Sequence, residues 1–140
     1  MKQAFVLDCS VTMSWCFGEG GNYAAGVMAS LRTGRAAVPS IWPLEVANAL
    51  LTSERKRRVA PGDSILFLDL LLGLPIEVER EAASTESWGR IMTLGRAHGL
   101  TSYDAAYLDL ALRLEWPLAT LDARLKRAAR LAGVELLDVS

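Results

Sequence analysis

Short apolar runs alternate with longer helical segments along this sequence, and no other feature constrains the fold as strongly. The first run, Ala4-Phe5-Val6-Leu7, ends at Asp8 and is typical of a strand buried on both faces. Strands are predicted at residues 4–7, 36–38, 76–79, 117–119 and 134–137, and helices at 11–17, 22–32, 43–58, 63–73, 84–97, 102–114 and 120–133. Because such alternation produces parallel sheets between helical layers, we predict a single α/β domain over residues 1–140, with a central parallel sheet flanked by helices.

Several helix ends are predicted from the residues that stop or cap helices. Pro61-Gly62 is expected to stop the helix that begins near residue 43, and Asp63 to cap the helix that follows. Ser102 and Thr120 are expected to cap two later helices, because Ser and Thr are common N-cap residues.

Composition excludes several classes of protein. Hydrophobic residues make up 51% of the 140 residues, which is too many for a disordered chain. The apolar run at 65–74 is interrupted by Asp69 and Gly73 and is too short to span a membrane. The chain meets Asp8 too early for a secretory signal, and Cys9 and Cys16 lack metal or disulfide-framework spacing. We therefore expect a soluble, cytoplasmic protein with two buried thiols and no membrane partner.

Four acidic residues stand at strand ends or helix starts: Asp8, Glu45, Asp104 and Asp122. Ligands of an open parallel sheet bind beyond the carboxyl ends of its strands, so the fold is expected to gather these acids on one rim. Converging carboxylates repel one another unless a cation lies between them, and oxygen ligands favour Mg²⁺, with Mn²⁺ as an alternative. The expected chemistry is metal-assisted hydrolysis of a phosphodiester.

Each acid also has a simpler interpretation. Asp104 and Asp122 could stabilise helix starts by about 0.3–1 kcal/mol each, and Asp122 could pair with Lys126. Glu45 could be an ordinary surface residue. Asp8 is the hardest to explain in this way, because a carboxylate that closes an apolar strand needs a partner.

Each acid lies in a longer segment, and the four segments cover residues 5–11, 42–50, 100–108 and 117–125. In this order and spacing they resemble the motifs of the PIN domain, particularly the VapC-type toxins of bacterial toxin–antitoxin pairs. The resemblance covers nearly the whole chain. It implies a Mg²⁺-dependent endoribonuclease that inhibits growth by cutting RNA, with a cognate antitoxin whose tail fills the groove, and a homodimer.

The resemblance also implies roles for particular residues. Asp8 and Asp104 would be the main metal ligands, and Glu45 and Asp122 would complete the acidic site directly or through water. The hydroxyls of Thr120 and Ser10, with Asn48 as a weaker candidate, would orient water or carboxylates. The simpler roles of these three are a helix cap for Thr120, a turn residue for Ser10 and a surface helix residue for Asn48.

Two basic clusters are candidates for holding RNA against the acidic centre. The net charge is −1, but setting the four site acids aside leaves 15 positive against 12 negative side chains. By themselves, such clusters are usually solvated helix ends. The candidate RNA-binding residues are Arg55, Lys56, Arg57, Arg58, Arg124, Lys126 and Arg127.

Three further expectations concern residues outside these motifs. Asp109 lies on another face of its helix from Asp104 and is expected to be exposed to solvent. Trp42, beside the helix of Glu45, is the tryptophan best placed to stack on RNA bases. The apolar run at 65–72 suits either deep burial or an interface with a second copy or an antitoxin.

Two other functions are consistent with parts of the sequence. A phosphatase of the haloacid dehalogenase type also begins with a strand that ends in Asp, but it needs a second Asp where this chain has Ser10. A non-catalytic module could use its acids for structure and its basic helices to hold RNA or a partner. For the nuclease, attack by water predicts products with 5′-phosphate and 3′-hydroxyl ends.

Overall fold

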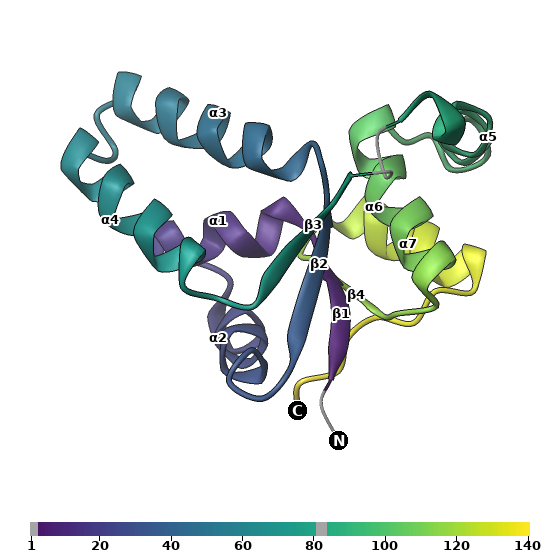
Figure 1. The fold of residues 1–140 in the computed structure, drawn as a ribbon, viewed down its shortest axis with the longest axis horizontal. Coiled ribbons are helices and arrows are strands. Elements are labelled where there is room, and N and C mark those ends of the chain that lie inside the picture. The colour runs from purple at the N-terminus through teal and green to yellow at the C-terminus, as the bar shows by residue number, and fades with distance from the viewer. Residues whose placement is uncertain (1–2, 81–83) are drawn as a thin grey trace.

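The computed structural model describes residues 3–80 and 84–140, and a parallel sheet lies at its centre (Figure 1). The strands are β1 (Ala4–Leu7), β2 (Arg35–Pro39), β3 (Ile76–Glu79) and β4 (Leu118–Ala119), in the order β3-β2-β1-β4. Every strand pairing is parallel, and β1 lies between β2 and β4. The predicted α/β class with a central parallel sheet is therefore confirmed.

Helices cover both faces of the sheet (Figure 1). On one side lie α1 (Cys9–Phe17), α2 (Gly21–Ser30), α3 (Trp42–Arg55) and α4 (Pro61–Leu72). On the other lie α5 (Trp88–His98), α6 (Ser102–Leu114) and α7 (Ala123–Ala132), with a short 3-10 turn, η2 (Thr85–Ser87), before α5. The connections bring the N-termini of several helices to the edge where the strands end.

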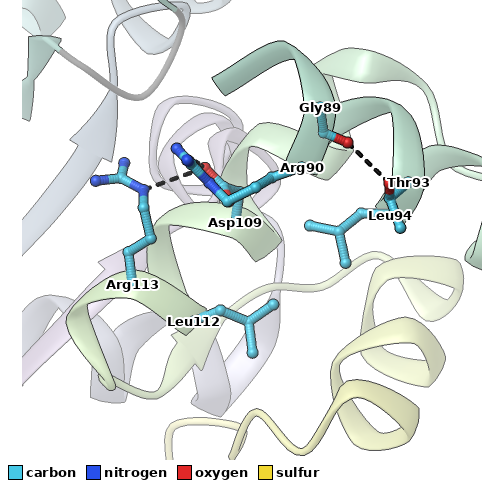
Figure 2. Close-up of a pocket in the computed structure, with 7 residues that line it drawn as sticks. All are labelled: Gly89, Arg90, Thr93, Leu94, Asp109, Leu112 and Arg113. Carbon is cyan, nitrogen blue, oxygen red and sulfur yellow. Dashed lines mark hydrogen bonds and ion pairs between the residues drawn. The ribbon is translucent and has the colours of Figure 1, made fainter. Parts of the chain in front are cut away.

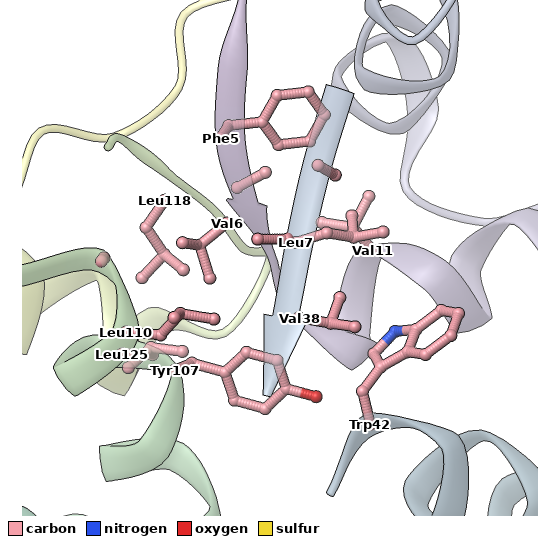
Figure 3. Packing of buried hydrophobic residues seen from close by; sticks show 14 of the residues in the cluster. Phe5, Val6, Leu7, Val11, Val38, Trp42, Tyr107, Leu110, Leu118 and Leu125 are labelled. Atoms are coloured by element: carbon pink, nitrogen blue, oxygen red, sulfur yellow. The ribbon is translucent and has the colours of Figure 1, made fainter. Parts of the chain in front are cut away.

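The core is built around β1 and α6. Phe5, Val6 and Leu7 are fully buried, as expected for the strand that has neighbours on both sides and helices on both faces (Figure 3). Tyr107 and Leu110 of α6 are also fully buried in the same cluster. α6 packs against β1 and β2, and this packing places the side chains of α6 relative to the carboxyl end of β1.

The boundary between α3 and α4 differs from the prediction. α3 ends at Arg55, and Pro61 is the first residue of α4 rather than the stop of α3. Proline is well suited to this position, because the first turn of a helix has no internal partner for an N–H group. Asp63 lies inside the first turn, where its Oδ2 accepts from the N–H of Ala60 at 3.2 Å.

The caps of the last two helices are each shifted from the predicted residue. Thr101, rather than Ser102, caps α6, because its Oγ1 accepts from the N–H of Asp104 at 3.1 Å. Asp122, rather than Thr120, caps α7, because its Oδ1 accepts from the N–H of Arg124 at 2.8 Å. The hydroxyl of Thr120 is therefore available for other contacts.

The strand predicted at 134–137 is reduced to a single parallel bridge between Leu118 and Leu136. Two backbone hydrogen bonds make this bridge, from Leu118 N to Glu135 O and from Leu137 N to Leu118 O. β4 itself has only two residues, which limits the length of any pairing with it.

Candidate acidic site

Asp8 is placed by the central strand. It follows β1 directly, is 5% exposed, and occupies the N-cap position of α1. Its N–H donates to the carbonyl of Ala119 at 3.0 Å, which ties it to the end of β4. An apolar strand buried on both faces therefore delivers one carboxylate to the carboxyl edge of the sheet, where parallel folds bind their ligands.

Two hydroxyl groups hold the side chain of Asp8. Its Oδ2 accepts from Ser10 Oγ at 2.6 Å and from Thr120 Oγ1 at 2.8 Å. The same hydroxyl oxygens accept backbone N–H groups, from Leu121 to Ser10 and from Asp122 to Thr120, both at 3.0 Å. Because each hydroxyl is oriented by the backbone and directs its proton at Asp8, the carboxylate has a fixed orientation.

Glu45 enters the site from the first turn of α3. Its Oε1 accepts a hydrogen bond from the hydroxyl of Tyr107 at 2.5 Å. Burial raises the pKa of Glu45, the bond from Tyr107 lowers it in part, and the charges of Asp8 and Asp104 raise it further. Sequence reasoning missed Tyr107, although its position three residues after Asp104 on the same helix places both on one face.

Asp104 lies in the first turn of α6, half-buried. Burial raises its pKa first, and the charges of Asp8 and Asp122 add to this, while Arg124 acts in the opposite direction. Burial likewise raises the pKa of Asp8, and the hydrogen bonds from Ser10 and Thr120 lower it in part. Asp8 and Asp122 thus lie close enough to Asp104 to oppose its ionisation.

The cysteine next to Asp8 shows the same electrostatic environment. Burial, with the charges of Glu45 and Asp8, raises the pKa of Cys9 to about 12. At neutral pH this thiol is protonated and is neither a nucleophile nor a thiolate ligand. The chemistry of the site therefore rests on oxygen atoms.

The described residues form no ion pair with any of the four acids. Among the described residues, no Lys, Arg or His nitrogen lies within 4.0 Å of the carboxylates of Asp8, Glu45, Asp104 or Asp122. Nor do any three acidic, histidine or cysteine side chains in this part of the chain already form a compact set of metal ligands. Hard oxygen donors with unbalanced negative charge fit a divalent cation such as Mg²⁺, and its arrival would draw the carboxylates together.

The remaining candidates divide into near and distant groups. Arg124 is close enough to Asp104 to affect its pKa, and α7 carries it together with Lys126 and Arg127. Asn48 is exposed on α3 and makes no side-chain hydrogen bond within the described ranges. Among the described residues it forms no hydrogen bond to any of the four acids.

The basic cluster of Arg55, Lys56, Arg57 and Arg58 lies at the far end of α3 from Glu45, about 15 Å away along the helix axis. Arg58 there pairs with Glu19 at 3.3 Å and covers the ring of Phe17. The structure therefore separates this cluster from the acids.

Two expectations for single residues are wrong. Asp109 is 1% exposed rather than solvated, because α5 packs over its side of α6. Its carboxylate accepts from Arg90 Nε at 2.8 Å and from Arg113 Nε at 3.2 Å, beside a hollow of about 410 Å³ (Figure 2). Trp42 is buried in the core, where its Nε1 donates to Thr12 Oγ1 at 3.0 Å, so it cannot stack on a base (Figure 3).

The apolar run at 65–72 is only partly buried. Phe67 and Leu71 pack into the core, but Ile65, Leu66 and Leu72 are exposed on α4. Beside them is a hollow of about 390 Å³ whose lining includes Pro43 and Leu72. The run as a whole is therefore not deeply buried. No helix within the described ranges combines the length and apolar character needed to cross a membrane.

Comparisons with known proteins agree with this architecture. The family model described as the PIN domain matches residues 5–131. No curated protein matches the chain significantly in sequence.

Solved structures with the same fold include proteins from several organisms. A chain in the crystal structure of VapBC2 from Rickettsia felis bound to a DNA fragment from their promoter is 18% identical, with a TM-score of 0.69, covering 99% of this chain and 100% of that one. PAE2754 from Pyrobaculum aerophilum is 22% identical, with a TM-score of 0.67, and the match covers 95% of this chain and 98% of that one. A toxin–antitoxin complex from Klebsiella pneumoniae gives 16% identity and a TM-score of 0.59, covering 84% and 86%.

Proposed function

Since this chain belongs to the PIN domain family, we propose that it is a Mg²⁺-dependent endoribonuclease and the toxin of a toxin–antitoxin pair, acting in the cytoplasm. One observation supports the proposal most strongly. Four carboxylates from separate elements share the carboxyl edge of the sheet with no protein cation within ion-pair distance among the described residues. Such an arrangement costs stability unless it serves a ligand, and a divalent cation is the ligand that removes the cost.

In the proposed site, each residue of the chain has a defined task. Asp8 and Asp104 would hold the metal, with Glu45 and Asp122 completing the set directly or through water. Mg²⁺, or Mn²⁺ in its place, would supply the Lewis acid that polarises the phosphodiester and activates water. Ser10 and Thr120 keep Asp8 in one orientation through their bonds to Oδ2.

Glu45 is the residue suited to take a proton from the attacking water. It lies in the first turn of α3, beside Asp8 and Asp104, so its carboxylate would be next to a water held by the metal. Tyr107 engages Oε1, so the proton would pass to Oε2, which accepts no hydrogen bond from the described residues. Attack by water leaves a 5′-phosphate and a 3′-hydroxyl.

Two features bear on the alternatives. In a phosphatase that uses Asp8 as its nucleophile, the residue two positions later would be an acid, whereas Ser10 donates its only proton to Asp8. A non-catalytic RNA-binding module would need neither the metal nor an oriented Asp8. The hydroxyl pair that orients this carboxylate therefore favours the nuclease.

A protein partner is proposed from the exposed apolar surface of α4. Leu72 is 83% exposed there, and Leu44 on the neighbouring α3 is exposed as well. Surfaces of this kind mark protein interaction sites. We propose that an antitoxin binds this chain. We also propose that two copies form a homodimer, and light scattering of the isolated chain would test for this dimer.

The nuclease is tested with purified protein and total RNA, in Mg²⁺, in EDTA, and with Asp8→Asn. We expect discrete fragments that require both the metal and Asp8, with activity falling more than about 100-fold in the variant. Asp69→Asn, an exposed acid on α4, is the matched control and should cleave normally. Cleavage that survives EDTA and Asp8→Asn would refute the mechanism, and tight RNA binding without cleavage would favour the binding module.

A further inference from the structure

A third hollow, of about 170 Å³, is lined by residues at the N-terminal ends of α3, α5 and α6. Two exposed aromatic residues line it, Trp88 at 66% and Tyr103 at 56% exposure. Ile41 and Ser102 contribute to the remaining lining, and none of the described residues that line it is charged. Tryptophan and tyrosine combine a large apolar ring with a polar group, so exposed ones around a concavity are suited to contact a ligand.

This hollow lies one helical turn from the proposed base. The carbonyl of Ile41 accepts from the N–H of Glu45 at 3.0 Å, so Ile41 is one turn before Glu45 on α3. Tyr103 is likewise one turn before Tyr107 on α6 and directly precedes Asp104. Tyr107 and Glu45 are hydrogen-bonded to each other. Ile41 and Tyr103, which line the hollow, each lie about one turn, or roughly 5.4 Å along the helix axis, from that hydrogen bond.

On the basis of the proposed nuclease function, we propose that this hollow binds one unpaired RNA base next to the cleaved phosphodiester. The base would stack on Trp88 and Tyr103. The surroundings favour a base over a phosphate, because the described lining residues are uncharged and include two aromatic rings, while the neighbouring centre is acidic. A hollow of about 170 Å³ is smaller than the roughly 300–1,000 Å³ of pockets that enclose a whole ligand, so it suits a single ring system. The exposed hydroxyl of Ser102 offers a polar group to the edge of that base.

This assignment replaces the stacking role expected for Trp42. Trp42 lies at the start of α3, but its ring faces the core and its Nε1 is bonded to Thr12. Trp88 opens α5 and projects its ring outwards beside the site. A base held there would place the substrate strand relative to Asp104 and would give the enzyme a preference at one nucleotide.

The test measures binding in the Asp8→Asn protein, so that cleavage does not interfere. The probes are a fluorescent twelve-nucleotide oligoadenylate and the same strand with abasic riboses. We expect Trp88→Leu to weaken binding of the oligoadenylate by roughly tenfold, the loss expected for one stacked base. Trp88→Phe should retain most of the affinity, and the abasic strand should bind equally to all three proteins.

Two controls accompany this measurement. Leu131→Ala, which removes an exposed apolar side chain from α7, should leave binding unchanged. Tyr103→Leu provides a second variant in case Trp88→Leu fails to fold, which circular dichroism would reveal. In the wild-type background, Trp88→Leu should raise KM more than it lowers kcat.

Several outcomes would overturn the inference. These are equal binding by Trp88→Leu, an equal loss on the abasic strand, or no binding of either strand by the Asp8→Asn parent. If Trp88→Leu instead weakens self-association in light scattering, the hollow is a protein interface. Cleavage of RNA by the wild-type chain is a separate result, so the nuclease can stand while the base site fails.

Discussion

Helix α6 carries two aspartates whose environments are opposite. Asp104, in its first turn, faces Asp8 and Asp122 and has no ion-pair partner among the described residues. Asp109, further along the same helix, is bonded to Arg90 and Arg113, and Arg113 also binds Glu79 at 2.6 Å. One carboxylate belongs to an unbalanced acidic cluster and the other to a balanced network.

The comparison shows that burial alone does not identify a functional acid. Asp8 and Asp109 are almost equally buried, at 5% and 1% exposure. Arginines neutralise Asp109, whereas the hydrogen bonds that Asp8 accepts from the described residues come from neutral groups, the hydroxyls of Ser10 and Thr120 and the backbone of Ser10. The first arrangement holds α5 on α6, and the second leaves a charge for a ligand to balance.

Replacing each aspartate of α6 by asparagine tests this difference most strongly. Asp109→Asn should lower the free energy of unfolding by about 3 kcal/mol, because it breaks a buried ion-pair network. This is the low end of the usual range, since Arg90 is half-exposed and can turn to water. Asp104→Asn should change stability by less than about 0.5 kcal/mol.

Urea denaturation of the two variants without divalent metal would measure both values. The comparison fails if Asp104→Asn is as destabilising as Asp109→Asn, because Asp104 would then be a structural residue as well.

Removing one of the two hydroxyl groups that donate to Asp8 should have the next largest effect, and it should lower RNA cleavage. Thr120→Val keeps the shape of the side chain but removes the bond to Asp8 Oδ2, so RNA cleavage should fall by about 10–100-fold. Thr120→Ser should restore most of the activity, because it returns the hydroxyl. Thr93→Val on α5 is the matched control, and wild-type cleavage by Thr120→Val would refute the positioning role.

A smaller effect than that of Asp109→Asn is expected at Asp8, and it is a gain in stability. The pKa of Asp8 is raised in the fold, so its ionised form destabilises the protein once the pH rises above its ordinary value. Without metal, Asp8→Asn should therefore be more stable than the wild type at pH 7.5 by about 1 kcal/mol. The difference should vanish as the pH falls below the ordinary range of an aspartate.

Thermal unfolding of both proteins across this pH range would test the sign. Mg²⁺ should stabilise the wild type more than the variant, because only the wild type keeps the full set of carboxylates. A variant that is less stable than the wild type at pH 7.5 would show that the charge of Asp8 is already balanced.

Much of the fold was predictable because its signals are local. The apolar run before Asp8 predicted the central strand, and the alternation of strands and helices predicted the parallel sheet. The match of the PIN domain model to residues 5–131 confirms the predicted family. Helix ends were less predictable, since Thr101 and Ser102 are equally good caps by residue type and the position of the turn decides between them.

The sequence by itself determined which residue types stand at the strand ends, because strand burial and helix capping depend on neighbours along the chain. Only the tertiary structure decided what those residues contact. Asp109 is paired because α5 brings Arg90 to it, and Trp42 is buried because the start of α3 packs on Thr12 of α1. Electrostatic and packing partners depend on distances in space, and residues far apart in the chain become neighbours only once the helices have packed on the sheet.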